Sequence, residues 1–73
     1  MATILPVEGK FPKFGNNCFV APNATVVGDV EIGDETSIWF NAVIRGDVNS
    51  IRIGNKVNIQ DGVVIHATYQ KTK

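Results

Sequence analysis

The sequence predicts an all-β protein built as a parallel β-helix, a solenoid in which short strands coil around one axis. Three observations predict this fold. Aliphatic residues recur at steps of six, a small or branched residue precedes each of them by two positions, and glycine, aspartate or asparagine residues lie between the resulting segments. A spacing of two is strand spacing, and the spacing of an amphipathic helix is absent. The short fixed period therefore determines the architecture before any single residue is interpreted.

Two in-phase blocks of aliphatic residues mark the inward side of the coil, and an insertion of three residues separates them. With three hexads in each coil, Val20 lies against Ile38 and Val26 against Ile44, so that like residues stack about 4.8 Å apart. The steps of six are counted on Val20, Val26, Ile32, Ile38 and Ile44, and then on Ile53, Ile59 and Ile65.

Each hexad also has a second inward position and ends in a bend. The inward positions two residues before the aliphatic ones are Ala24, Val30, Thr36, Ala42, Ile51, Val57 and Val63. The bends need a positive φ or local side-chain hydrogen bonding, which glycine, aspartate and asparagine provide. They are predicted at Gly28-Asp29, Gly33-Asp34, Gly54-Asn55 and Asp61-Gly62.

The two ends of the chain are expected to differ from the repeat. Residues 1–18 contain scattered proline and glycine and are predicted to form an irregular lead-in that covers the first coil, while residues 19–73 form an incomplete hexapeptide-repeat β-helix. Open ends of solenoids need capping. Since the sequence stops shortly after the coil that Ile65 completes, without a polar cap, we expect a chain truncated at its C-terminus.

Composition excludes several classes of function. Seven basic and seven acidic residues are interspersed without a charged run, which argues against binding to nucleic acid or to an anionic membrane. A single cysteine excludes an intrachain disulfide and paired-cysteine metal spacing. No signal peptide or membrane-spanning apolar run is present, so a cytoplasmic protein is expected. A chain this short buries little surface alone, which favours a partner subunit.

The insertion is expected to form a loop, Gly46-Asp47-Val48-Asn49-Ser50, that leaves the sides in phase, and on that basis the outward residues distinguish three sides of the coil. The first side is apolar yet exposed, which is typical of an interface, and the third is solvated. Trp39 on the second side has two interpretations, packing under the lead-in or adding area to an interface. The first side carries Thr25, Val27, Val43, Arg45, Val64 and His66; the second carries Phe19, Ala21, Ser37, Trp39, Asn58 and Gln60; the third carries Glu31, Gly33, Arg52 and Gly54.

His66 is the only histidine of the sequence. It is interpreted either as a structural side chain or as a metal ligand. One ligand does not hold zinc, because a catalytic zinc site normally has three protein ligands and an open position for water. The other ligands would come from further chain or from neighbouring subunits.

The run IRGDVNSIRIGNKVNIQDGVVIHA resembles the signature of the γ-class carbonic anhydrases and their hexapeptide-repeat relatives. The likeness extends over residues 20–67. It implies a left-handed β-helix that assembles into a homotrimer, with zinc, iron or cobalt held at each subunit interface by three histidines. It also implies hydration of CO2 to bicarbonate by metal-bound hydroxide, and His66 as the first of the three ligands.

The same resemblance implies roles for five further residues. Arg45 and Asp47 are similar to the pair that makes ionic contacts across the trimer interface, and Asp61 to their partner near the site. Gln60 resembles the residue that hydrogen-bonds the metal-bound water or bicarbonate, with Asn58 supporting it. From the residues alone, Asn58 and Gln60 are equally open to interpretation as a ladder of turn-stabilising amides.

Two departures from the family pattern limit what is expected of this chain. Val48 follows Arg45-Gly46-Asp47 where the prototype has an acidic residue that is tied to proton transfer. The remaining two histidines are expected beyond Lys73, so the 73-residue chain is expected to be inactive alone. The alternatives are a catalytically inactive hexapeptide-repeat trimer or metal-binding scaffold, and a coenzyme A-dependent acyltransferase.

Overall fold

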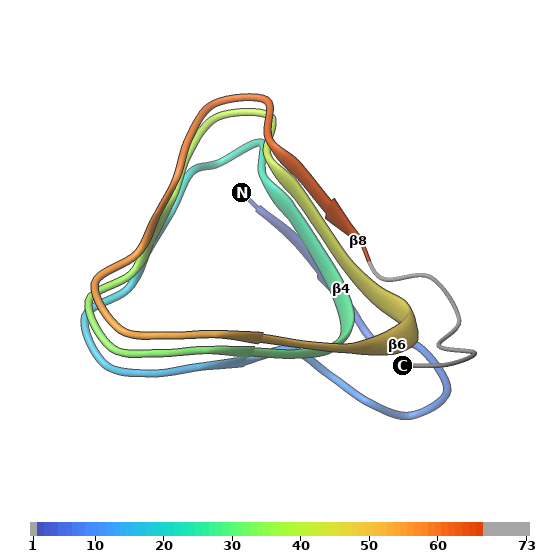
Figure 1. The fold of residues 1–73 in the computed structure, drawn as a ribbon. Coiled ribbons are helices and arrows are strands. Elements are labelled where there is room, and N and C mark those ends of the chain that lie inside the picture. The colour runs from blue at the N-terminus through green and yellow to red at the C-terminus, as the bar shows by residue number, and fades with distance from the viewer. Residues whose placement is uncertain (1, 67–73) are drawn as a thin grey trace, which may run out of the picture.

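The computed structural model describes residues 2–66, which wind into stacked triangular coils (Figure 1). Seen along the axis, the chain runs clockwise as it comes toward the viewer, which makes the coil left-handed. The strands are β1 (Thr3–Leu5), β2 (Lys13–Phe14), β3 (Phe19–Val20), β4 (Thr25–Ile32), β5 (Ser37–Ile38), β6 (Val43–Ile53), β7 (Asn58–Ile59) and β8 (Val64–His66).

The register of the strands confirms the predicted β-helix. Each pairing between these strands is parallel, in the orders β1-β4-β6-β8 and β3-β5-β7, with β2 also paired to β4. Val20 lies opposite Ile38, and Val26 lies opposite Ile44, as the step of six predicts. The columns continue to Ile59 and Ile65, so the insertion leaves the sides in phase.

The interior is the predicted column of aliphatic side chains. Thr36 is the one buried polar residue among those described, and it is only 1% exposed. Its hydroxyl donates to the carbonyl of Gly54 at 2.8 Å and accepts the N–H of Val57 at 3.3 Å, so its polar atom is satisfied. The buried apolar residues of the core are Ala24, Val26, Val30, Ile32, Ile38, Ala42, Ile44 and Ile59.

The three-residue insertion lies at one corner of the triangle. β4 and β6 pass around this corner side by side, and their register shifts there, from Gly28 opposite Gly46 to Val30 opposite Ile51. The sequence predicted a loop at this point. The structure instead accommodates the extra residues as an irregularity within the 11-residue β6. A bulge re-aims the chain at a corner without ending the strand pairing.

The lead-in contributes two strands that the sequence did not predict. β1 and β2 pair with β4, with Ile4 opposite Val26 and Phe14 opposite Ile32. Phe14 lies six positions before Val20 and continues the period, but Ile4 lies ten positions before Phe14, which hid Ile4 from a search for the repeat. The extra residues form a corner turn closed by a backbone bridge between Val7 and Lys10.

The bends lie at the three predicted corners, and they use both positive φ and side-chain hydrogen bonding. Gly28 and Gly62 have positive φ, as expected. At the third corner the left-handed residues are Glu35 and Lys56, and the side chain of Asn55 accepts the N–H of Asp34 at 2.7 Å. Side-chain bonding between coils therefore replaces glycine conformation at that corner. Among residues 2–66, no helix has the length and apolar character that crossing a membrane requires.

Candidate functional site

The first side of the coil carries two rows of outward residues that run across β1, β4, β6 and β8. In one row His66 lies opposite Arg45, and Arg45 lies opposite Val27. The row extends to Leu5 in β1, which is 51% exposed and which the sequence analysis missed. Leu5 directly follows the inward Ile4, just as Val27 directly follows the inward Val26. This shared position in the hexad could have identified Leu5 as an outward residue of the first side.

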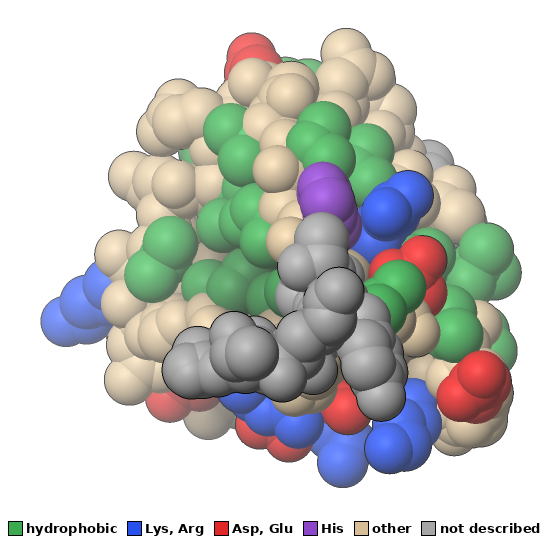
Figure 2. Space-filling view, turned by 45° about the vertical axis from the view of Figure 1, so that its right-hand side comes forward, with side chains coloured by type: hydrophobic (Ala, Val, Ile, Leu, Met, Phe, Trp, Pro, Cys, Tyr) green, Lys and Arg blue, Asp and Glu red, His purple; other side chains and the backbone are tan. Residues whose placement is uncertain are grey.

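The first side is an apolar surface with a basic end. Figure 2 shows hydrophobic side chains gathered beside the single histidine, with a basic side chain next to it. Val64 is 60% exposed, and the second row of this side continues from it through Val43 to Thr25. We call this face, made of Leu5, Thr25, Val27, Val43, Arg45, Val64 and His66, the first-side surface.

The two basic residues of the first-side surface are exposed and have no ion pair with residues 2–66. Arg52 on the third side differs, because it lies 3.1 Å from Asp29 and 3.5 Å from Glu31. The charges of the third side thus neutralise one another within the chain. Within residues 2–66, no carboxylate neutralises Arg45 or His66.

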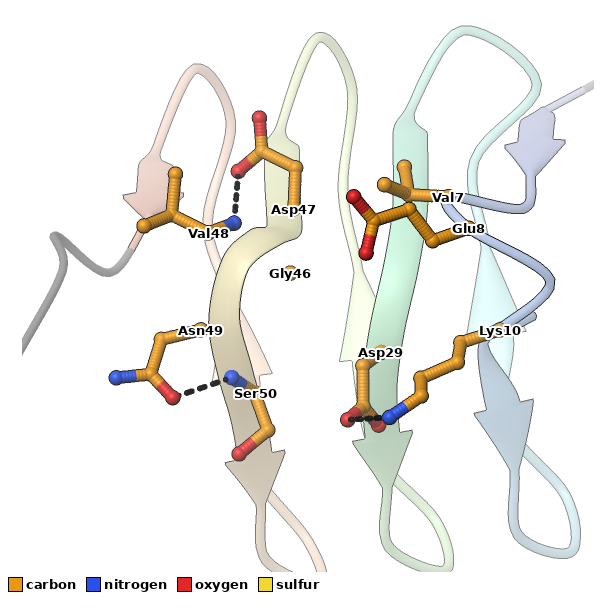
Figure 3. A pocket seen from close by; sticks show the side chains of 9 residues that line it. All are labelled: Val7, Glu8, Lys10, Asp29, Gly46, Asp47, Val48, Asn49 and Ser50. Carbon is orange, nitrogen blue, oxygen red and sulfur yellow. Dashed lines mark hydrogen bonds and ion pairs between the residues drawn. The ribbon is translucent and has the colours of Figure 1, made fainter.

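Asp47 leaves the first-side surface at the inserted corner. Its Oδ1 accepts the N–H of Val48 at 2.9 Å, which orients the carboxylate. A groove of about 220 Å³ lies between this corner and the turn of the lead-in (Figure 3). The 4.0 Å ion pair of Lys10 with Asp29 lies at the same groove. Val48 is 52% exposed and brings no acidic group to this place.

Asn58, Gln60 and Asp61 lie on the second side and at the bend after it. Asn58 accepts a hydrogen bond from the hydroxyl of Ser37 at 2.6 Å, while Gln60 and Asp61 are exposed. Gln60 begins a bend, since the N–H of Val63 donates to its carbonyl at 3.2 Å. A complete side of the triangle therefore separates these residues from His66 within one chain, and the structure does not bring the two groups together.

An aromatic cluster covers the second side one coil below Gln60. The rings of Phe19 and Trp39 are 4.8 Å apart, and those of Trp39 and Phe40 are 6.2 Å apart. The indole N–H donates to Ser37 at 2.9 Å. Trp39 therefore packs on its neighbours of the same surface, while Phe19 and Phe40 stay more than 40% exposed. Ala21, expected to point outward here, is fully buried.

The described residues provide one suitable metal ligand but not a complete set of ligands. Within the described part of the chain, no three His, Cys, Asp or Glu side chains are grouped so that they could hold a metal ion. His66 offers one exposed imidazole with no hydrogen-bond partner in residues 2–66. An imidazole in this setting fits one position of a zinc, iron or cobalt site that other polypeptide segments complete.

Comparison with known proteins adds the relatives of this chain. The model of the bacterial transferase hexapeptide family (six repeats) matches residues 11–46. A carbonic anhydrase of Geobacillus kaustophilus is 56% identical over 86% of this chain and 35% of its own length. Gamma carbonic anhydrase 2 of Arabidopsis thaliana mitochondria is 48% identical over 88% of this chain and 23% of its own length.

Other relatives have different names. The uncharacterized transferase YtoA of Bacillus subtilis is 51% identical over 94% of this chain and 40% of its own length. The crystal structure of a candidate acetyltransferase from Bacillus cereus superposes with a TM-score of 0.84, at 49% identity, over 86% of this chain and 37% of that one. The chain thus spans well under half the length of these relatives.

Proposed function

Because this chain belongs to the hexapeptide-repeat family and is similar to γ-class carbonic anhydrases, we propose that it forms the N-terminal part of a trimeric metalloprotein that hydrates CO2 to bicarbonate. One observation carries the proposal. His66 is exposed on an apolar outward face, in register with Arg45, which has no ion pair within residues 2–66. This is the position of a ligand that is completed from another subunit.

His66 holds the metal through a ring nitrogen in this proposal. The metal, zinc or another divalent transition metal, supplies Lewis acidity that makes water a nucleophile near neutral pH. The apolar residues around His66, above all Val64 and Val43, exclude bulk water once a neighbouring subunit covers them. Exclusion of water strengthens every electrostatic interaction inside the site.

The residues of the second side act from a neighbouring subunit. Gln60 and Asn58 lie one complete side away from His66 in their own chain, so only a second copy brings an amide to the metal. An amide orients a bound water or bicarbonate without competing for the metal. Arg45 and Asp47 make ionic contacts across the same interface, with Asp61 as their partner, because a guanidinium bonds carboxylates with fixed geometry.

The proposed site lacks a side chain at position 48 that could accept the proton released by water. Water loses one proton in each cycle, and a carboxylate near the metal would accept it. Val48 occupies the position after Arg45-Gly46-Asp47, and its side chain has no acid or base. We therefore expect slow turnover that depends on buffer as the proton acceptor.

The proposal is tested on the full-length polypeptide that contains this chain. We expect zinc-loaded protein to hydrate CO2 above the buffer rate, and His66→Ala to remove the activity and most of the bound zinc. Asn49→Ala at the corner is the matched control, because its side-chain oxygen bonds only the adjacent N–H of Ser50. Zinc content by elemental analysis and stopped-flow CO2 hydration are the measurements. Wild-type metal content in His66→Ala would refute the assignment of His66.

Two other functions follow from the same relatives. A trimeric metal-binding scaffold without turnover is consistent with Val48, and it would retain zinc while showing no CO2 hydration. A coenzyme A-dependent acyltransferase is suggested by the relative named a transferase. Thermal stabilisation of the protein by coenzyme A would favour that function, and absence of stabilisation would leave the metalloprotein.

A further inference from the structure

We propose that Trp39 is the aromatic surface on which Arg45 of a neighbouring copy stacks, so that the aromatic cluster of the second side is the docking surface for the first-side surface. This inference rests on the proposed shared site and names the contact that assembles it. Its occupant is a second copy of this chain. The metal ligands are separate from this contact. Arg45 is shared with the ionic contacts, because a guanidinium bonds carboxylates at its edge and stacks on an aromatic ring through its face.

The rows of the coil set the height of each residue along the axis. The N–H of Trp39 donates to the carbonyl of Ile59 at 2.9 Å, and Trp39 and Gln60 begin equivalent bends, so Trp39 lies one coil below Gln60. Arg45 lies one coil below His66 on the first side. In this proposal the copies are related by rotation about an axis parallel to the coil, which places equal coils at equal heights.

A contact between Gln60 and the histidine of the next copy therefore determines what meets one coil below. At that level Trp39 faces the neighbouring Arg45. One coil lower still, the row positions bring Phe19 of the second side to the level of Val27. The cation of Arg45 thus meets the aromatic face of Trp39, and the exposed ring of Phe19 meets the aliphatic side chain of Val27.

The chemistry of the two partners is complementary. Arg45 has no ion pair with residues 2–66, whereas Arg52 has two carboxylates within 3.5 Å. Trp39 is held by Phe19 on one side and by its hydrogen bond to Ser37, so its ring is fixed in place. A guanidinium over a fixed indole is attracted by the ring quadrupole and is desolvated at little cost.

The test uses the 73-residue chain in the presence of a chelator, so that metal plays no part. Trp39 is the only tryptophan, and its emission reports on this surface alone. We expect emission to shift to the blue as association proceeds in sedimentation experiments. Trp39→Leu and Arg45→Gln are each expected to weaken association about 2- to 30-fold. The double variant is expected to weaken association by less than the product of the two single effects.

Three controls separate stacking from loss of fold or charge. Phe11→Leu and Lys13→Gln change an exposed aromatic residue and a cation away from both surfaces, and they are expected to leave association unchanged. Arg45→Lys keeps the charge without the planar group and is expected to lie between wild type and Arg45→Gln. Circular dichroism confirms that each variant keeps its strands.

The failure of this inference is distinguishable from failure of the proposed function. Association with unchanged Trp39 emission, or with effects of the two substitutions that multiply independently, overturns the stacking while zinc binding still tests the shared site. A chain that stays monomeric up to millimolar concentration also overturns it. If the protein binds no zinc or does not hydrate CO2, but the Trp39 and Arg45 substitutions remain coupled, the stacking inference stands and only the proposed metalloenzyme function is rejected.

Discussion

At the scale of single residues, Gly46 shows how a backbone position supports the candidate site. It separates Arg45 from Asp47 and is buried against the neighbouring coil, where an added Cβ would come within 2.8 Å of the carbonyl carbon of Asp29 and closer still to its oxygen. Gly28 has a φ of 82° at the paired position and an equally close neighbour in Gly46. Two glycines thus let β4 and β6 approach at the corner from which Asp47 projects.

Gly46→Ala is the residue-scale prediction. Its methyl group meets backbone that has no room to move, so we expect a loss of about 1–3 kcal/mol in the free energy of unfolding. Gly54→Ala is the matched control, because nothing lies within 4 Å of its added Cβ. That control is expected to be neutral or to stabilise by up to about 1 kcal/mol. Urea unfolding followed by circular dichroism measures both, and equal stability of the two variants would contradict the close approach.

At the scale of elements, the columns of inward residues carry the stability of the coil. Ile4, Val26, Ile44 and Ile65 form one column, in which Val26 and Ile44 are fully buried. Ile65 is only half-buried. Position in the stack therefore determines how much apolar surface each strand removes from water.

Ile44→Ala is the element-scale prediction. The substitution leaves a cavity between β4 and β8, and we expect it to cost about 2–5 kcal/mol. Ile65→Ala removes the same atoms from the half-buried end of the same column and is expected to cost roughly half as much. Thermal and urea unfolding give the two values. Equal losses would show that the outer coil is as tightly packed as the middle one.

At the scale of the whole molecule, the outward faces indicate assembly. Leu5, Val64, Phe19 and Phe40 are all more than 40% exposed, and large apolar side chains gathered on one face are typical of an interface. Their two surfaces lie on adjacent sides of the triangle (Figure 1). Burial of these surfaces between copies would contribute stability that one copy alone does not have.

A concentration-dependent Tm is the prediction for the whole molecule. If association stabilises the fold, a 100-fold increase in chain concentration is expected to raise the Tm by roughly 10 °C, through mass action of about 2 kcal/mol per chain. Val64→Lys on the first-side surface is expected to abolish this dependence, whereas Lys13→Gln on the third side keeps it. Scanning calorimetry at two concentrations measures the shift. A Tm that does not change with concentration would contradict assembly through these faces.

The sequence by itself determined the coil and the side and height of its outward residues, except for Ala21, which is fully buried. With inward positions two apart at a step of six, and with the insertion assumed to leave the sides in phase, counting predicted the rows that pair Arg45 with His66 and Ser37 with Asn58. The site residues could be named for the same reason, since their heights and sides follow from their numbers. What each residue does there stays a prediction.

Only the tertiary structure decided the features that break the period. Ile4 joins the stack across an irregular turn, and the inserted residues stay within β6, because the neighbouring coils offer backbone partners that no local sequence pattern records. The packing of the Trp39 ring on Phe19 is likewise a contact that the position of Trp39 in the hexad does not record. Local spacing determines which way a side chain points, while pairing across coils determines what it meets.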